Sequence, residues 1–157
     1  MSLLQCYLKV FFGGKMYIEI LQQYMANFEG LKFQPAVAED DITEAEMRLN
    51  ILFPNELKNL LCEINGDNFL LWSLDQMIKE NLELRSMNPK IVEPERFDFS
   101  NFLFFATNGC GDYYGYKVEN GKILSTSIFV FDHEEYVARF VAANVLQLIE
   151  LYYTDRI

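Results

Sequence analysis

Three side chains have types suited to thiol chemistry: Cys110, Asp112 and the single histidine of the chain, His133. A thiol nucleophile needs a base within about 3 Å, and that base needs a third group to orient it. His133 stands between Asp132 and Glu134. Neighbours along an extended segment point to opposite faces, so both carboxylates lie on one side and the imidazole on the other. A Cys110–His133–Asp112 arrangement requires the cysteine turn to fold beside the strand end. The sequence favours a structural histidine that ties a strand end to the last helix.

The chain offers little for a metal or a phosphate group. Structural zinc needs about four Cys or His ligands, commonly in close pairs. The four available residues stand far apart in the sequence: Cys6, Cys62, Cys110 and His133. Calcium would need an EF-hand-like pattern, which the carboxylates Asp112, Asp132, Glu134 and Glu135 do not follow. Residues 109–111 lack the lysine and the following helix of a phosphate-binding loop. We therefore expect no cofactor, no metal and no enzymatic activity.

A protein-binding surface is the site that these side chains favour most. Trp and Tyr anchor protein interfaces, and acidic groups attract a basic partner. The residues predicted to contact a partner are Trp72, Asp112, Tyr113, Tyr114, Glu134 and Glu135. On a strand Tyr114 and Tyr116 share a face and Tyr113 takes the other, so at least one of these rings is expected in the core. Acids at 39–41 and Asp67 extend the acidic group, although each acid alone is more typical of a solvated charge.

The composition limits the partner classes. A chain of 157 residues with 51% hydrophobic and 23% charged residues is one globular domain with a sizeable core. Thirteen basic against 23 acidic residues give a formal net charge of −10. This balance argues against nucleic-acid binding, which depends on clustered Lys and Arg. It suits a basic protein partner, and it also serves solubility.

Three cysteines, an odd number without close spacing, fit a reducing, cytoplasmic environment better than a disulfide framework. No apolar run approaches the ~20 residues needed to cross a bilayer, so no membrane association is expected. Gln5 and Lys9 interrupt the apolar start, which argues against a signal peptide. We expect residues 1–15 to be a tag or a poorly ordered leader and residues 16–157 to form a single domain.

The first half of the chain predicts helices. Apolar spacing predicts one over 17–28, and Thr43 with Glu46 forms a capping box for a second that runs to about Leu49. Asn50 then suits a left-handed turn. Phe53-Pro54 opens a third, which Asn65-Gly66 closes. Leu57, Leu60, Leu61 and Ile64 form its apolar face, at spacings of i, i+3, i+4 and i+7. The segment 69–72 reads as a short strand followed by a helix over 74–82. Residues 85–95 read as a long, mobile surface connection.

The second half predicts a sheet. Residues 102–106 and 113–116 are aromatic-rich runs joined by an Asn-Gly and Gly-Asp turn, which predicts a central hairpin. Residues 123–132 predict one or two further strands after Asn120-Gly121. A last helix is expected from about Glu134 or Arg139 to Tyr153. Helices, then strands, then a helix indicate an α+β fold: a single domain with an antiparallel sheet covered by helices.

A collinear series of short motifs runs through the chain. The first part joins Glu46, Leu49-Asn50, Phe53-Pro54 and Leu57-Lys58 to Asn65-Gly66-Asp67. The later parts are 103–106 with Gly109, Gly111-Asp112 and Tyr114, then 131–134, then 141–149. Over roughly residues 42–153 this series resembles the SUKH superfamily (Smi/Knr-type domains). Asn50, Phe53 and Leu57 stand where the family usually has Gly, Leu and Tyr.

This resemblance implies a compact α+β domain and, in bacteria, an immunity protein that binds and neutralises a cognate toxin. It carries over no catalytic residues. The expectation is therefore a non-catalytic protein, monomeric or weakly homodimeric, with a basic toxin domain as partner. The alternative is a scaffold or regulatory adaptor of the same superfamily without a toxin partner, as in its eukaryotic members. A small-molecule-binding domain or a thiol enzyme is the third class.

Overall fold

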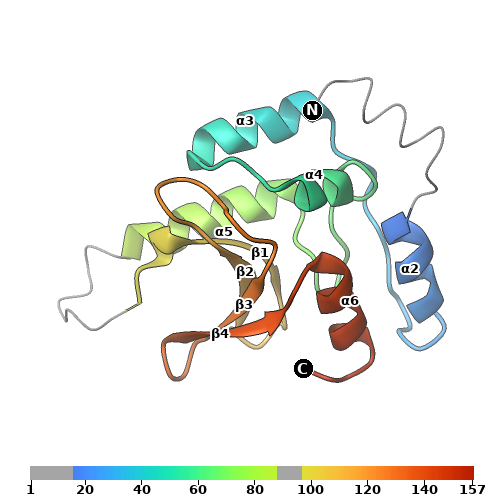
Figure 1. Ribbon diagram of the computed structural model, residues 1–157. Coiled ribbons are helices and arrows are strands. Elements are labelled where there is room, and N and C mark those ends of the chain that lie inside the picture. Colours follow the sequence, from blue (N-terminus) through green and yellow to red (C-terminus); the bar gives the residue numbers. More distant parts are fainter. Residues whose placement is uncertain (1–15, 88–96) are drawn as a thin grey trace.

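A four-stranded antiparallel sheet forms the centre of the molecule, and helices pack around it (Figure 1). The computed structural model describes residues 16–87 and 97–157. Its helices are α2 (Met16–Tyr24), α3 (Glu39–Leu49), α4 (Asn55–Leu61), α5 (Leu74–Met87) and α6 (Val145–Tyr153), with a 3-10 turn, η2 (Phe99–Asn101). Its strands are β1 (Phe102–Thr107), β2 (Tyr113–Lys117), β3 (Ile128–Asp132) and β4 (Val137–Ala142). The α+β class predicted from the sequence is confirmed.

The strands follow one another across the sheet in sequence order, β1-β2-β3-β4. Because side chains alternate along a strand, the aromatic residues divide between the two faces. One face carries Phe102, Phe104, Tyr113, Phe129 and Phe131, and the other carries Leu103, Phe105, Tyr114, Tyr116 and Ile128. Gly115 of β2 pairs with Phe104 of β1. A glycine is required at this position because a Cβ there would lie 2.4 Å from the carbonyl oxygen of Leu103.

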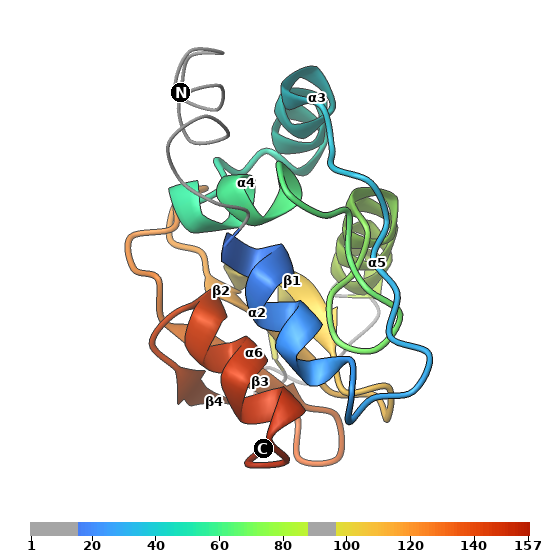
Figure 2. The same cartoon turned by 90° about the vertical axis from the view of Figure 1, so that its right-hand side faces the viewer.

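Helices are fixed to the sheet by buried polar side chains. At the outer edge of β1, the Asn81 amide of α5 donates to the Phe104 carbonyl at 2.7 Å and accepts from the Phe104 N–H at 2.9 Å. On the second face, the buried Tyr116 hydroxyl donates to Glu56 of α4 at 2.6 Å. Figure 2 shows α2 and α6 side by side in front of the sheet, below α4. These contacts satisfy buried polar groups and hold the sheet in a fixed position.

The capping box predicted at Thr43 and Glu46 is wrong. Helix α3 begins at Glu39, and Thr43 lies inside it with its hydroxyl donating to the Glu39 carbonyl. Acids at 39–41 favour this earlier start, since they face the positive end of the helix dipole. Glu46 instead accepts from the Phe53 N–H and the Lys58 ammonium, both at 2.6 Å. The predicted left-handed turn at Asn50 is confirmed by its φ of 53°.

The strand predicted at 69–72 is also wrong. One carboxylate oxygen of Asp67 accepts the N–H groups of Phe69, Leu70 and Leu71, which removes these donors from a strand ladder. The segment still makes one bridge to the sheet, Leu71 to Ala106. It therefore covers the outer edge of β1.

The start of the last helix differs most from the prediction. Residues 137–142 form β4, and α6 begins only at Val145, where the Asn144 side chain accepts from the Gln147 N–H. Of 123–132, only β3 is a strand. Helix α5 extends to Met87 and so includes Arg85, and the first helix ends at Tyr24 rather than near Phe28. The predicted leader at 1–15 and connection residues 88–95 lie outside the described residues.

Candidate functional site

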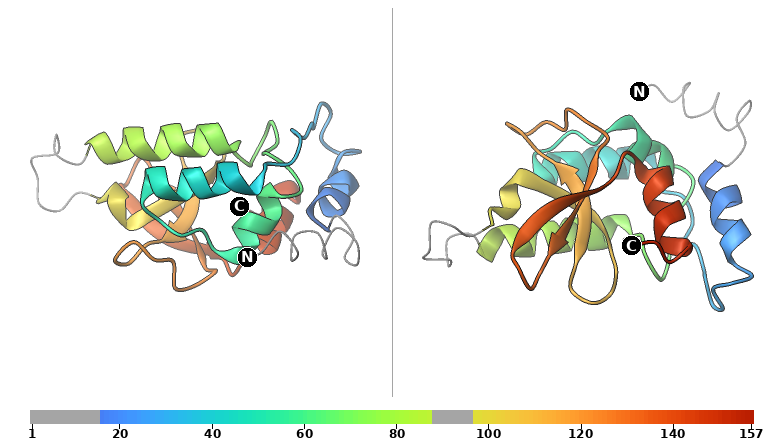
Figure 3. Two further views of the ribbon diagram at one scale, coloured as in Figure 1. Left: turned by 90° about the horizontal axis from the view of Figure 1, so that it is seen from above. Right: turned by 60° about the horizontal axis from the view of Figure 1, so that its bottom comes forward.

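Two turns lie side by side at one end of the sheet. Pairing of Tyr113 with Phe131 places the β1–β2 turn next to the β3–β4 turn. The right-hand view of Figure 3 shows both at the lower end of the sheet. We call residues 108–112 and 132–136 the paired turns.

The carboxylate of Asp112 joins the paired turns. One of its oxygens lies 2.7 Å from Nδ1 of His133 and accepts the His133 backbone N–H at 3.1 Å. The imidazole lies over Gly111, whose φ is +106°; a Cβ there would lie 3.0 Å from the ring, closer than an ordinary van der Waals contact. His133 thus ties β3 to the β1–β2 turn, and the predicted tie to the last helix is wrong.

The β1–β2 turn is ordered by its own side chains. The Asn108 amide oxygen accepts the N–H groups of Cys110 and Asp112, and its nitrogen donates to the Asp112 carboxylate at 2.9 Å. The Thr107 hydroxyl donates to the Asp112 carbonyl and accepts the Gly109 N–H. A turn with this many internal bonds loses little conformational freedom when a partner binds.

The β3–β4 turn is built around Asp132. One Asp132 oxygen accepts the N–H groups of Glu134 and Glu135, and the other accepts from Arg139 at 2.8 Å. Arg139 also bonds the Glu135 carboxylate. Tyr136 closes the turn with a φ of 58° and its ring edge-on to Phe131.

The paired turns carry a negative field. Four carboxylates (Asp112, Asp132, Glu134 and Glu135) face one guanidinium, that of Arg139. Partial burial raises the pKa of Asp112, but hydrogen bonds from His133 and Asn108 outweigh it and lower this pKa. The hydrogen bond to Asp112 raises the pKa of His133. Backbone and Arg139 hydrogen bonds lower the pKa of Asp132, so both aspartates stay ionised near neutral pH.

The predicted contact residues divide into two groups. Asp112, Glu134 and Glu135 come together at the paired turns, and half-buried Tyr113 lies at the start of β2. Trp72 and Tyr114 are only 5% and 3% exposed. The centroids of the Trp72 and Tyr113 rings lie 5.4 Å apart. Trp72 therefore packs beneath the start of β2, in the core.

Sequence reasoning did not include Arg139, Asp132 or His133 among the contact residues. Arg139 was missed because residues 137–142 were read as possible helix rather than strand. His133 was recognised as reactive, but its partner Asp112 lies 21 residues away and only the strand register brings them together.

The thiol arrangement is incomplete in geometry. The Nδ1 atom of His133 lies 2.7 Å from Asp112, which is the contact that a carboxylate makes when it orients a catalytic base. No hydrogen bond joins His133 to Cys110 among the described residues, so the contact between base and nucleophile is the part that is lacking there. Over the same ranges, no cluster of three His, Cys, Asp or Glu residues has metal-binding geometry.

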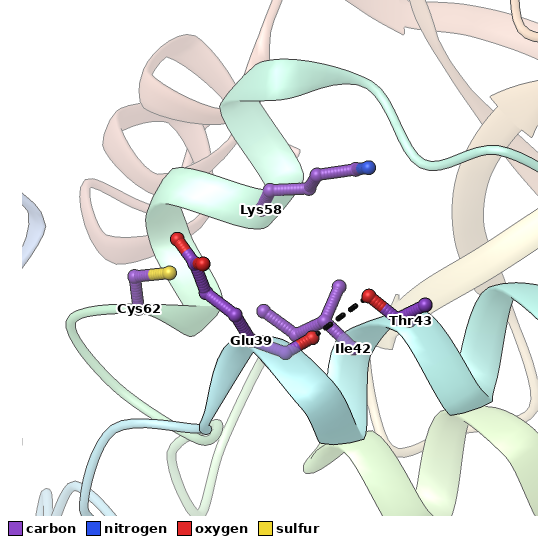
Figure 4. A pocket seen from close by; sticks show the side chains of 5 residues that line it. All are labelled: Glu39, Ile42, Thr43, Lys58 and Cys62. Carbon is purple, nitrogen blue, oxygen red and sulfur yellow. Dashed lines mark hydrogen bonds between the residues drawn. The ribbon is translucent and has the colours of Figure 1, made fainter. Parts of the chain in front are cut away.

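A small pocket lies between α3 and α4 (Figure 4). It is lined by Glu39, Ile42, Thr43, Lys58 and Cys62 and has a volume of about 80 Å³. Ligand pockets are typically ~300–1,000 Å³. The pocket therefore has room for a few water molecules but not for a metabolite.

The fold places the chain in the class of small α+β domains. Its acidic surface, at the paired turns, is exposed at one end of the sheet. The chain belongs to the SMI1/KNR4 family (SUKH-1), whose model matches residues 36–151. This family is generally non-catalytic. A search of curated proteins found no match to the chain. In the described ranges, no helix combines the length and apolar character needed to span a membrane.

Proposed function

We propose that this chain is a cytoplasmic immunity protein that binds a cognate toxin and blocks its active site with the paired turns. The observation that carries this proposal is the convergence of Asp112, Glu134 and Glu135 at one end of the sheet. Membership of the family supports it, because SUKH domains are typically immunity proteins for polymorphic toxins. The scaffold or adaptor role is the alternative that the test must separate.

The charge pattern explains how such a complex forms quickly. With a net charge of −10, the chain attracts a basic domain over distances of about a Debye length, ~8–10 Å at physiological salt. The side chains of Glu134 and Glu135 are exposed on the β3–β4 turn, where a partner can contact them. Electrostatic complementarity of this kind raises the association rate and rejects acidic competitors.

The internal hydrogen bonds give the surface its shape. Asp112 and Asp132 are held by bonds to His133, Asn108 and Arg139, so their carboxylates have fixed positions. A partner that places Lys or Arg side chains opposite them does not have to order a flexible loop. This preorganisation favours tight, specific binding over loose attraction.

The test is affinity capture from a lysate of the source organism, with the purified chain as bait, at low and at high salt. Recovery of a basic toxin domain whose yield falls as salt rises is the expected result. Addition of the purified chain must then inhibit the activity of that toxin. Recovery of housekeeping proteins alone, or of no partner, would contradict the proposal and favour the adaptor role.

A further inference from the structure

Strand β4 is the open edge of the sheet. It is the last strand in the order β1-β2-β3-β4, and Figure 1 shows it at the lower border of the molecule. None of the described residues hydrogen-bonds to the backbone groups that point outward from it. In an antiparallel ladder about half of an edge strand's N–H and C=O groups point away from its neighbour. They provide a template for one more strand.

The opposite edge of the same sheet is protected. The Trp72 N–H donates to the Phe105 carbonyl at 3.0 Å, and the Thr107 N–H donates to the Leu70 carbonyl at 2.9 Å. The segment that carries Trp72 thus covers β1. Strand β4 has no such cover among the described residues, and its sequence, VARFVA, contains neither proline nor lysine. Its one charged residue is Arg139, and a register shift at Val141 limits the regular part of the edge to residues 137–140.

Exposed apolar side chains line this open edge. Phe140 is 61% exposed and meets Phe129 edge-on, while Tyr136 and Val137 are 46% and 38% exposed. Aromatic side chains of this kind contribute strongly to protein interfaces. Backbone pairing and apolar contact are therefore offered along the same strand.

The charges beside β4 select the partner. Asp132, Glu134 and Glu135 stand at its start, and the one cation on the strand, Arg139, is already bonded to Asp132 and Glu135. Three carboxylates against one guanidinium leave two negative charges. A second copy of this chain, itself carrying −10, would be repelled. A basic extended segment would be attracted.

We infer that β4 is a docking edge that accepts an extended, basic segment of the partner as a fifth strand of the sheet. This inference deepens the proposed function, on which it rests for the identity of the partner. The inserted strand pairs with β4 through main-chain hydrogen bonds, as in other cases of strand addition. Its apolar side chains contact Phe140 on one face of the sheet, and its cations lie near Glu134 and Glu135.

The first test needs no toxin. The ¹⁵N-labelled full chain is titrated with an alternating lysine–valine peptide long enough to span β4, and with its glutamate–valine counterpart. We expect the basic peptide to shift the amide signals of 137–142 and to slow hydrogen exchange at about half of them, with the acidic peptide inactive. Shifts spread over all acidic surfaces without slowed exchange in β4, or equal binding of both peptides, would overturn the inference.

Self-association is checked in the same samples. If β4 amides become protected without peptide as the protein concentration rises, and sedimentation shows a dimer, a second copy occupies the edge and the inference of a basic partner is wrong.

The second test uses the captured partner. The variant Phe140→Lys places a positive charge on the edge strand. The control variant Leu52→Lys places the same charge outside β4, at a side chain of similar exposure, 63%. We expect Phe140→Lys to weaken capture at least tenfold and Leu52→Lys to leave it near the wild-type level. A toxin captured equally by both variants would overturn the docking edge while leaving the immunity function intact.

Discussion

The carboxylate of Asp112 holds His133 at two points, the backbone N–H at 3.1 Å and ring Nδ1 at 2.7 Å. Two turns that are distant in sequence are thereby joined at the end of the sheet. The acidic surface proposed to bind a toxin depends on this link for its shape.

Replacing Asp112 with Asn should lower the pKa of His133, because the hydrogen bond to the carboxylate is the main cause of its elevation. The chain has one histidine, so an NMR titration of its ring protons follows this residue without ambiguity. Glu134→Gln is the control: Glu134 acts on His133 only through space, so the pKa should fall less. Equal falls in the two variants would contradict the hydrogen-bonded geometry.

The same pair sets a pH dependence of stability. The pKa of His133 is raised, so its stabilising contribution is complete below about pH 6.5, the usual unfolded value, and is lost as pH rises through the folded-state pKa. The pKa of Asp112 is lowered, so its contribution is present above about pH 3.9 and is lost as pH falls through the lowered pKa. Urea unfolding from pH 5 to 9 should show a decline in the wild type that His133→Ala lacks.

Substitution of Gly111 by Ala should destabilise the protein by roughly 1–3 kcal/mol, since the new methyl group meets the imidazole in an unfavourable backbone region. Gly109→Ala is the matched control: its φ is also positive, +78°, but nothing lies within 4 Å of the added carbon. It should cost less. Removing the ring with His133→Ala should recover part of the Gly111→Ala loss, and strictly additive free energies would contradict the contact.

Charge reversal at Glu134 should weaken toxin binding on the order of tenfold, mainly through a slower association rate. The side chain of Glu134 makes no hydrogen bond in the described structure, so the melting temperature should change little. Glu44→Lys makes the same change of charge on α3, which lies at the top of Figure 1 while β4 lies at the bottom. This variant should weaken toxin binding much less. Asp112→Lys is a less selective probe, because it also breaks the link to His133.

Glu46→Ala should cost roughly 1–3 kcal/mol, because the Phe53 N–H loses its acceptor in a buried position. Lys58→Met removes the ion pair but leaves that hydrogen bond in place, so its cost should be smaller. Denaturant unfolding of both variants measures the difference. A larger loss for Lys58→Met would show that the ion pair, not the backbone bond, is the stabilising contact.

Local patterns predicted most of the helices and the central hairpin. The α4 face of Leu57, Leu60 and Leu61 is buried as its spacing indicates, and the turn glycines stand between β1 and β2. Strand β4 was not predicted, because its apolar residues continue into those of α6 at helical spacing without a proline or glycine between them. The signal that would have separated the two elements is Asn144, whose side chain caps the start of α6.

The candidate site was harder to predict than the fold. The sequence placed Asp112 on a turn, which is where it lies. Glu134 and Glu135 were expected next to a strand end or at the start of the last helix, and they lie instead on the β3–β4 turn. Their assembly depends on the register of β2 against β3, which no local pattern specifies. Burial of Trp72 and Tyr114 was likewise settled by tertiary packing, since an aromatic residue on a strand suits a core and an interface equally well.

The order of strands also has a consequence for folding kinetics. Each strand pairs with the next one in the chain, so the sheet can grow by successive closure of short loops, the longest joining Lys117 to Ile128. Small closures carry a low entropic barrier and give faster folding than distant pairings. The C-terminal half, once collapsed, offers its two aromatic faces as a surface on which helices from the first half condense.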